Sequence, residues 1–430
     1  MSLRVAMLSV HTCPLAALGG KQTGGMNVYV REVSRELGRM GLAVDVFTRS
    51  QDPTIRRVVP LGEGARVVHL PAGPEMPIAR ERIHDHLDEF VDGVDAWRVA
   101  SGADYDLIHA HYWLSGVVAL ALRDRWSVPV LQMFHTLGRF KNGAARRLDD
   151  LEPSIRLDEE QRIVGGVDGL VAASVVERRA LIHDYGADPA HATVIPCGVD
   201  TAVFRPGDRD AARARIAPGE APLLLYVGRI APIKGLETLL DAVARLRARG
   251  SSARLLVVGG EADEPVDGHE AAIRRRVDAL GLRDAVRFVG AQPQEDLRDY
   301  YVAADVTVLP SYYESFGMVA LEAMACGSPV IGSRVGGLAT TVRDGVTGFL
   351  VPDGDAAALG ERIETLVDDA DLRFRLGREG VQWAARHRWP CVAESICREY
   401  ARLEARAEPH LASERADPPP RLSAATRGSS

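Results

Sequence analysis

The sequence predicts an α/β protein with two doubly wound domains, each built on a parallel sheet. The chain has 430 residues, more than one hydrophobic core normally serves. Short apolar runs rich in branched residues alternate with longer helical patterns, as expected for strands buried on both faces and joined by crossover helices. This series starts afresh after a turn-rich segment near the middle of the chain, which indicates two such units.

Six strands are expected in the first half. The N-terminal apolar run is interpreted as the first of them and not as a signal peptide, because no small-residue cleavage site follows it. The predicted strands are Arg4–Val10, Ala43–Thr48, Leu107–His111, Pro129–His135, Gly169–Ala173 and Thr193–Pro196.

A domain boundary is expected in Pro196–Gly207, which contains two prolines and two glycines. We therefore assign residues 1–200 to the first domain and residues 201–385 to the second. The second half also carries six predicted strands. They are Leu223–Gly228, Arg254–Gly259, Val286–Gly290, Val306–Pro310, Pro329–Gly332 and Gly348–Val351.

The C-terminal stretch Gly380–Ala405 is predicted to form one or two helices interrupted at Pro390. Residues 386–406 or so are expected to return to the first domain. The tail from about residue 407 to Ser430 is rich in Pro, Ser, Arg and Ala and poor in large apolar residues. That composition predicts disorder.

Composition narrows the class of function. The chain has 52 basic and 59 acidic residues, a formal charge of −7, which argues against nucleic acid as a partner. Its five cysteines are widely spaced without a CxxC pair, so neither a disulfide framework nor a zinc site is indicated. The sequence contains no run of about 18 apolar residues, so no membrane span is expected. A cytoplasmic enzyme is the simplest interpretation, and a homodimer is compatible with it.

The most informative motif is PSYYESFGMVALEAMACGSPVIGS, residues Pro310–Ser333. It follows a predicted strand and opens a helix. Ser315, Phe316 and Gly317 leave backbone N–H groups available at the helix N-terminus, where a diphosphate can bind. Glu314 precedes the helix, and Glu322 lies inside it, placed to accept hydrogen bonds from ribose hydroxyls. A lone pair of glutamates at this spacing would be an ordinary loop and cap, but the flanking turn favours a binding site.

The second motif is VGRIAPIKGLETLLDAVARL, residues Val227–Leu246. Arg229 and Lys234 follow a buried strand and precede an amphipathic helix. A departing diphosphate gains negative charge as its bond to the sugar breaks, and two cations in this position can stabilise that charge. Either cation alone would be an unremarkable solvated residue.

Glycines and polar residues at strand ends also indicate a ligand-binding side in the first half of the chain. Gly24 and Gly25 stand at a helix start, where a ligand can approach the backbone closely. His111 and His135 each emerge at the end of an apolar strand. A single histidine there is more often structural than ligand-binding. Two such strand ends in one half favour a shared pocket.

Together these motifs resemble those of the retaining GT-B glycosyltransferases, of the family 4-like type. Within them the chain is most similar to the D-inositol-3-phosphate glycosyltransferases of mycothiol synthesis, over roughly residues 3–405. The closer likeness is carried by HTCPLAALGG, GGMNVYV, HYWLSG, HTLGRFKN and EPSIRLDEEQ. The segment RERIHDHLDEFVDGV departs from that pattern and looks more like sucrose-phosphate synthase.

The resemblance implies a GT-B fold, with two Rossmann-like domains facing across a cleft. The first would bind the acceptor and the second the nucleotide sugar. The implied donor-binding residues are Gly25, Arg229, Lys234, Glu314, Ser315, Phe316, Gly317 and Glu322. The implied catalytic residues are His135, Arg229, Lys234 and Glu314, with His135 close to the anomeric centre.

On the acceptor side, the family holds a phosphate with a basic residue, a tyrosine, a threonine and a second basic residue. These map onto Arg80, Tyr112, Thr136 and Arg156, with His11 and Asn27 lining the same side. Arg80 stands where lysine is expected, which keeps the charge but changes the geometry of phosphate binding. The acceptor is therefore left open between an inositol phosphate and a sugar phosphate.

Family members are thought to react on one face of the donor sugar without a carboxylate nucleophile. The leaving β-phosphate can take the proton of the incoming hydroxyl, so the protein positions the substrates and stabilises charge. Arg229 and Lys234 can supply a metal's charge, so catalysis is expected to need no cofactor, although a divalent ion is compatible. The UDP-sugar is a co-substrate.

Four functions remain in competition. The first is transfer from UDP-N-acetylglucosamine or UDP-glucose to a phosphorylated polyol such as 1D-myo-inositol 3-phosphate. Its close alternative is transfer from UDP-glucose to fructose 6-phosphate, as in sucrose-phosphate synthase. A nucleotide-sugar epimerase, or a non-catalytic nucleotide-sugar sensor, would use the same scaffold.

Overall fold

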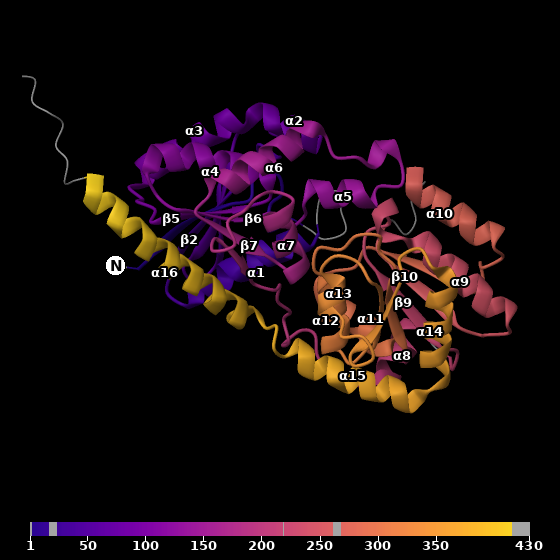
Figure 1. Ribbon diagram of the computed structural model, residues 1–430. Coiled ribbons are helices and arrows are strands. Elements are labelled where there is room, and N and C mark those ends of the chain that lie inside the picture. The colour runs from indigo at the N-terminus through magenta and orange to yellow at the C-terminus, as the bar shows by residue number, and fades with distance from the viewer. Residues whose placement is uncertain (1, 17–23, 218, 261–267, 415–430) are drawn as a thin grey trace, which may run out of the picture.

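The computed structural model describes residues 2–16, 24–217, 219–260 and 268–414, and side chains as far as Arg406. Part of the phrase HTCPLAALGG therefore lies outside the described residues. Figure 1 shows two α/β domains side by side, with a long C-terminal helix running back along the first domain.

The first domain is built on an eight-stranded sheet with the order β3-β4-β2-β1-β5-β6-β7-β8. β1 lies at the centre and pairs in parallel with β2 and β5. Its strands are β1 Arg4–Leu8, β2 Ala43–Arg49, β3 Val58–Gly62, β4 Ala65–Leu70, β5 Leu107–His111, β6 Val130–Met133, β7 Gly169–Ala172 and β8 Ala192–Val194.

Two of these strands were not predicted. β3 and β4 form an antiparallel hairpin at the edge of the sheet, so the expectation of six parallel strands is wrong for this domain. The run that forms β3 is short, contains Pro60, and ends in the turn Gly62–Gly64. Proline is tolerated at a sheet edge, where no neighbouring strand requires its missing N–H group.

Helices cover both faces of this sheet (Figure 1). α3, α4 and α6 pack over one face around Phe90, Leu114 and Ile163, whereas α1 packs over the other around Tyr29 and Val33. The helices of the domain are α1 Gly25–Arg39, α2 Arg80–Ile83, α3 Leu87–Ser101, α4 Trp113–Trp126, α5 Gly138–Ala144, α6 Ser154–Gly166 and α7 Val175–His183, with 3-10 turns η1 His84–His86 and η2 Leu148–Asp150.

The second domain has a six-stranded parallel sheet with the order β11-β10-β9-β12-β13-β14. Its strands are β9 Leu223–Val227, β10 Arg254–Val258, β11 Val286–Gly290, β12 Val306–Leu309, β13 Val330–Ser333 and β14 Gly348–Val351. Its helices are α8 Arg209–Ile216, α9 Leu236–Ala248, α10 Gly268–Ala279, α11 Leu297–Ala303, α12 Met318–Ala325, α13 Leu338–Thr341, α14 Ala356–Asp368 and α15 Ala370–Ala384, with 3-10 turns η3 Pro232–Lys234 and η4 Gln294–Asp296.

The chain crosses between the domains twice, and the two crossings lie side by side. The backbone N–H group of Val199, on the outgoing segment, donates to the carbonyl of His387, on the returning segment, over 2.7 Å. Trp389 packs on Gly198, where a Cβ atom would lie 2.5 Å from the indole ring. α16 (Trp389–Glu414) then packs against α1 of the first domain (Figure 1).

The C-terminal stretch differs from expectation at its end. α16 remains helical as far as Glu414, so the first part of the predicted disordered tail is helical, and residues 415–430 lie outside the described residues. The preceding run ARLEAR consists of strong helix formers, which favours continuation. Pro390 lies in the first turn of α16, where its missing N–H group breaks no hydrogen bond of the helix.

Candidate active site

A cavity of about 1000 Å³ lies between the two domains. It is bordered by the residues that follow the carboxyl ends of β5 and β6 in one domain, and of β9 and β12 in the other. Open α/β sheets bind their ligands at this end. Every residue predicted for the donor side, and each predicted for the acceptor side except Arg156, lines the cavity.

The two cations predicted for the diphosphate lie in the loop after β9. Lys234, at the end of η3, forms an ion pair with Glu314, with 2.5 Å between Nζ and Oε2. Both side chains are only partly buried, so the pair borders the cavity. Arg229 is exposed, and its backbone carbonyl accepts a hydrogen bond from the Tyr226 hydroxyl over 2.7 Å. A fixed loop therefore presents both cations to the cleft.

Hydrogen bonds from the residues at the two ends of α13 hold the loop before α12 in place. The N–H group of Gly337 donates to the carbonyl of Glu314 over 2.9 Å, and the Thr341 hydroxyl donates to the carbonyl of Phe316 over 2.6 Å. A Cβ atom on Gly337 would lie 1.9 Å from the carbonyl oxygen of Ser315, so only glycine permits this approach. Residues 315–319, at the N-terminus of α12, line the cavity and are thus held in a fixed position.

Glu322 lies one turn inside α12 and is almost fully buried. Its carboxylate accepts hydrogen bonds from the Tyr301 hydroxyl over 2.8 Å and from Nε2 of Gln294 over 3.1 Å. Burial raises the pKa of Glu322 to about 7, and these two hydrogen bonds only partly oppose the shift. Gln294 in turn accepts a hydrogen bond from Arg31 of α1, 2.7 Å away, which links the two domains next to this carboxyl group.

The first residues of α1 approach α12 across the cleft. A Cβ atom on Gly25 would lie 3.3 Å from Sδ of Met318, the first residue of α12. Asn27 is buried, and its amide nitrogen donates to Thr12 over 2.6 Å and to the carbonyl of Cys13 over 2.7 Å. Its amide therefore holds the loop after β1 in place, a structural task that the sequence did not reveal.

Three histidines form a buried row that reaches the cleft. Nδ1 of His111 lies 3.0 Å from Nε2 of His135, and the His109 and His111 rings are 4.3 Å apart. His135 leaves β6 with φ 62°, a left-handed conformation that turns its ring toward its neighbours and the cavity. Burial lowers the pKa of His135 to about 3, so the ring is neutral near pH 7.

His11 lies against Tyr112, with 4.3 Å between the two ring centroids. Burial, helped by the neighbouring Arg80, His135 and Arg156, lowers the pKa of His11 to about 3. His11 is therefore a neutral group that can exchange hydrogen bonds with a ligand hydroxyl.

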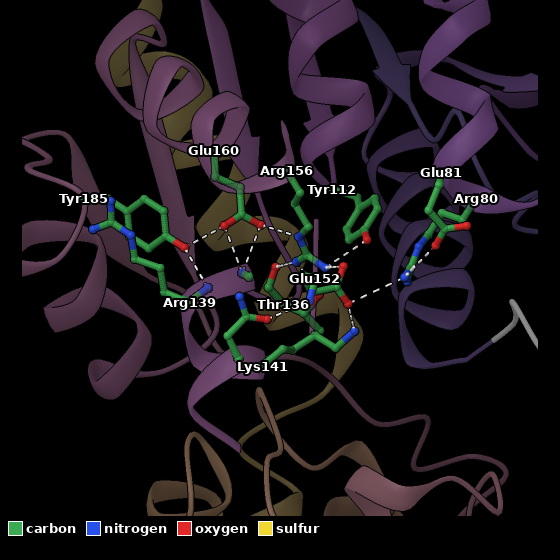
Figure 2. Close-up of polar contacts among 12 residues, drawn as sticks. Arg80, Glu81, Tyr112, Thr136, Arg139, Lys141, Glu152, Arg156, Glu160 and Tyr185 are labelled. Atoms are coloured by element: carbon green, nitrogen blue, oxygen red, sulfur yellow. Dashed lines mark hydrogen bonds and ion pairs between the residues drawn. The ribbon is translucent and has the colours of Figure 1, made fainter. Parts of the chain in front are cut away.

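The four residues predicted to hold the acceptor phosphate come together, although they belong to four separate segments (Figure 2). Nη1 of Arg156 lies 3.0 Å from the Tyr112 hydroxyl, and Nη2 lies 3.1 Å from the Thr136 hydroxyl. The Arg156 guanidinium also stacks over the Tyr112 ring at 4.9 Å. Arg80 approaches the same group from the start of α2.

Sequence reasoning missed two charged residues of this cluster. Glu152 pairs with Nη1 of Arg156 at 2.8 Å and with Nη2 of Arg80 at 3.5 Å. Lys141 forms a further short ion pair with Glu152. Both residues belong to sequence segments that carry the family resemblance, HTLGRFKN for Lys141 and EPSIRLDEEQ for Glu152. The four-residue spacing of Glu152 and Arg156 was an available signal, since it pairs side chains along a helix.

Among residues 2–16, 24–217, 219–260 and 268–414 there is no group of three or more His, Cys, Asp or Glu side chains arranged to hold a metal ion. Within the same ranges, no helix is both long enough and apolar enough to cross a membrane. The expectation of metal-independent catalysis stays a prediction.

Two segments of the chain match models of known protein families. The model described as Glycosyltransferase Family 4 matches residues 23–203, and the model described as Glycosyl transferases group 1 matches residues 208–383. D-inositol 3-phosphate glycosyltransferase 2 of Catenulispora acidiphila is 42% identical, with 93% of this chain and 95% of that protein covered. The D-inositol 3-phosphate glycosyltransferase of Kineococcus radiotolerans gives the same three values. Among solved structures, the sucrose-phosphate synthase from Thermosynechococcus elongatus is 37% identical, with a TM-score of 0.87 and coverage of 94% of this chain and 99% of that chain.

Proposed function

The chain belongs to the family 4-like glycosyltransferases of the GT-B fold, and from this premise we propose that it transfers a sugar, with retention of configuration, from a UDP-sugar to a phosphorylated polyol or sugar. The donor is UDP-N-acetylglucosamine or UDP-glucose. The acceptor class is represented by 1D-myo-inositol 3-phosphate, in keeping with the relatives that are 42% identical over 93% of the chain.

One observation carries this proposal. A single cleft is lined by two groups of cations, one from each domain: Arg229 and Lys234 follow β9, and Arg80 and Lys141 lie on the side of the first domain, with Arg156 buried beside them. Two separate anionic groups therefore fit the cleft at once. A diphosphate on the donor and a phosphate on the acceptor meet this requirement.

On the donor side, Arg229 and Lys234 bind the diphosphate and stabilise the charge that develops on it. Glu322, set back in α12, accepts hydrogen bonds from the ribose hydroxyls. Glu314 is held beside Lys234 by their ion pair and is placed for the hydroxyls of the transferred sugar. The first turn of α12 adds N–H groups that favour an anion.

The reaction then proceeds on one face of the sugar. The bond between the anomeric carbon and the β-phosphate oxygen breaks, and a bond to the acceptor hydroxyl forms on the same face. The proton of that hydroxyl passes to a β-phosphate oxygen, and UDP leaves. His135 is neutral at pH 7 and lines the cleft, so it assists by hydrogen bonding near the anomeric centre and not as a charged acid. His11 lines the acceptor side.

The protein's contribution in this scheme is positioning and charge stabilisation. Arg229 and Lys234 replace the charge that a divalent metal ion would supply, so turnover should survive chelation of metal ions by EDTA. A loss of turnover on chelation that magnesium restores would contradict this part of the proposal.

A second candidate is transfer from UDP-glucose to fructose 6-phosphate. It is favoured by the 37% identity and the TM-score of 0.87 to the sucrose-phosphate synthase, and it would use the same phosphate subsite. The glycosyltransferase relatives do not favour the epimerase or the sensor alternative.

The experiment that tests the function is a matrix of donors and acceptors with the full-length protein. UDP-glucose, UDP-N-acetylglucosamine and GDP-mannose are each incubated with inositol 3-phosphate, fructose 6-phosphate and their unphosphorylated forms. We expect one UDP-sugar to give a product whose anomeric configuration, determined by NMR, matches that of the donor. Products of inverted configuration, or equal use of GDP-mannose, would contradict the proposal.

A further inference from the structure

The cations of the acceptor subsite converge on a side chain of the protein itself. Oε2 of Glu152 lies 2.8 Å from Nη1 of Arg156, and Oε1 lies 3.5 Å from Nη2 of Arg80. Lys141 forms a short ion pair with the same Oε1. Figure 2 shows the Glu152 carboxylate in the middle of these three cations, which come from three different segments of the chain.

This carboxylate is held in its charged form. The Glu152 side chain is only 4% exposed, and burial by itself acts to raise its pKa. Arg156, Arg80 and Lys141 outweigh burial and bring the pKa of Glu152 to about 2. An internal anion with a full charge therefore occupies the place that the proposed function gives to the acceptor's phosphate.

A second carboxylate contacts Arg156 but has a different environment. Glu160 accepts from Nε of Arg156 over 2.7 Å, from the backbone N–H of Gly138 over 2.9 Å and from the Tyr185 hydroxyl over 2.6 Å. It is fully buried and does not line the cleft, whereas Glu152 does. Glu160 anchors Arg156 in the fold, and Glu152 neutralises the face of Arg156 that a ligand would meet.

The segment that carries Glu152 has little apolar packing to resist a movement. Leu151 is 46% exposed and Leu148 is 85% exposed, so neither side chain fixes the connection between α5 and α6. Segments with few buried apolar contacts open at a low free-energy cost. The backbone N–H of Glu152 donates to Oδ1 of Asn142 over 2.7 Å, so withdrawal from the cations needs a rotation of the side chain and no movement of these leucines into or out of the core.

We propose that Glu152 is a displaceable internal anion, which occupies the phosphate subsite while the acceptor is absent and gives way to the acceptor's phosphate. This inference rests on the proposed function, because it names how that same subsite selects its ligand. A carboxylate attached to the chain competes as if present at millimolar concentration. A phosphate monoester near pH 7 carries a charge of about −1.5 to −2 and offers three acceptor oxygens, so it can replace Glu152 where a singly charged anion cannot.

The test measures binding of inorganic phosphate by isothermal titration calorimetry, with the full-length protein and without donor. In Glu152→Gln the competing charge is gone while the size of the side chain is kept, so we expect phosphate to bind at least tenfold more tightly than to the wild type. The matched control is Glu81→Gln, which removes a carboxylate that also faces Arg80 at 3.5 Å but is 56% exposed. We expect it to change phosphate affinity less than threefold. Phosphate affinity in Glu152→Gln equal to or weaker than that of the wild type would overturn the proposal.

A second variant covers the case in which Glu152→Gln does not fold. Glu152→Ala leaves the three cations facing one another, so phosphate should raise its thermal unfolding midpoint by several degrees more than that of the wild type. An equal shift in both proteins would overturn the proposal. Neither measurement involves a sugar donor. If no phosphorylated acceptor is glycosylated and yet the variants bind phosphate as expected, the proposed function fails and the role of Glu152 stands. If transfer occurs and the phosphate response is absent, the role of Glu152 fails alone.

Discussion

Lys234 is the single residue whose role is easiest to isolate. Its Nζ lies 2.5 Å from Glu314 at the edge of the cleft, and its side chain is 22% exposed, so it has no part in the core. We expect Lys234→Ala to fold normally and to lose roughly 100- to 1000-fold in turnover, as is typical when one stabiliser of developing charge is removed. Steady-state kinetics with the preferred donor measure this loss. Arg249→Ala, which removes an exposed cation paired with Glu364 in the same domain, is the control and should keep normal turnover.

The pKa of Glu322 leads to a prediction about proton release on UDP binding. Burial raises its pKa to about 7, so near pH 7 roughly half of these side chains carry a proton. Hydrogen bonds donated by ribose hydroxyls favour the charged form and lower this pKa. UDP binding at pH 7 should therefore release up to about half a proton from this group. Calorimetry in two buffers of different ionisation enthalpy measures the release. Glu322→Gln should abolish it, and an unchanged proton count in the variant would refute the assignment to ribose.

The ends of individual strands explain how much of the site could be predicted. β5 and β6 are followed by Tyr112 (φ 76°) and His135 (φ 62°), both in left-handed conformations that turn the chain at the cleft. A polar residue at the end of an apolar strand is visible in a sequence, which is why both were identified. The roles of Lys141 and Glu152 were not, because they follow from ion pairs between segments that only the tertiary fold brings together.

The same distinction applies to whole elements. Long parallel strands produce continuous apolar runs, so their positions were predicted, with errors of one or two residues at the ends. The β3–β4 hairpin was missed because an edge strand needs apolar residues on fewer positions and tolerates Pro60. Asn27 was assigned to the acceptor side and lines the cleft, and its amide nitrogen also holds the loop after β1, which the sequence did not reveal. A short polar side chain gives no sign in the sequence of whether its partner is the protein or a ligand.

The return of α16 to the first domain leads to a prediction about stability. The Tyr400 hydroxyl lies 2.8 Å from Nδ1 of His109, and both side chains are buried. Tyr400→Phe leaves that ring nitrogen without a partner, which should cost about 1–3 kcal/mol in the free energy of unfolding of the first domain. Urea denaturation measures the change. Ser395→Ala, which removes a hydroxyl bonded only within α16, is the control, and equal effects of the two substitutions would contradict a special role for the pair.

At the scale of the whole molecule, charged side chains of both domains meet at the cleft. The chain carries a formal charge of −7, yet cations from both domains face the cavity between them. Contacts across the cleft join the domains beside both subsites. The Arg146 guanidinium stacks over the Tyr312 ring at 4.2 Å, two residues before Glu314, and Arg31 reaches Gln294 next to Glu322. The donor and acceptor subsites thus lie on two domains that contact each other near these residues and at the paired crossings.

From the cations of the cleft we expect the acceptor to carry a phosphate. An acceptor without a phosphate cannot take the place of Glu152 beside these cations, so it forgoes the charge-assisted hydrogen bonds that a phosphate would receive. The most direct measurement compares kcat/KM for a phosphorylated acceptor and its unphosphorylated form, in the wild type and in Arg156→Lys. Lysine keeps the charge that Glu160 requires but loses the forked geometry of the guanidinium.

We expect the wild type to prefer the phosphorylated acceptor by at least about 100-fold, since charge-assisted hydrogen bonds contribute about 1.5–3 kcal/mol each. Arg156→Lys should raise the KM for the phosphorylated acceptor by roughly tenfold or more and leave the KM for the donor nearly unchanged. Equal use of the free and the phosphorylated acceptor by the wild type would contradict the assignment of the cleft.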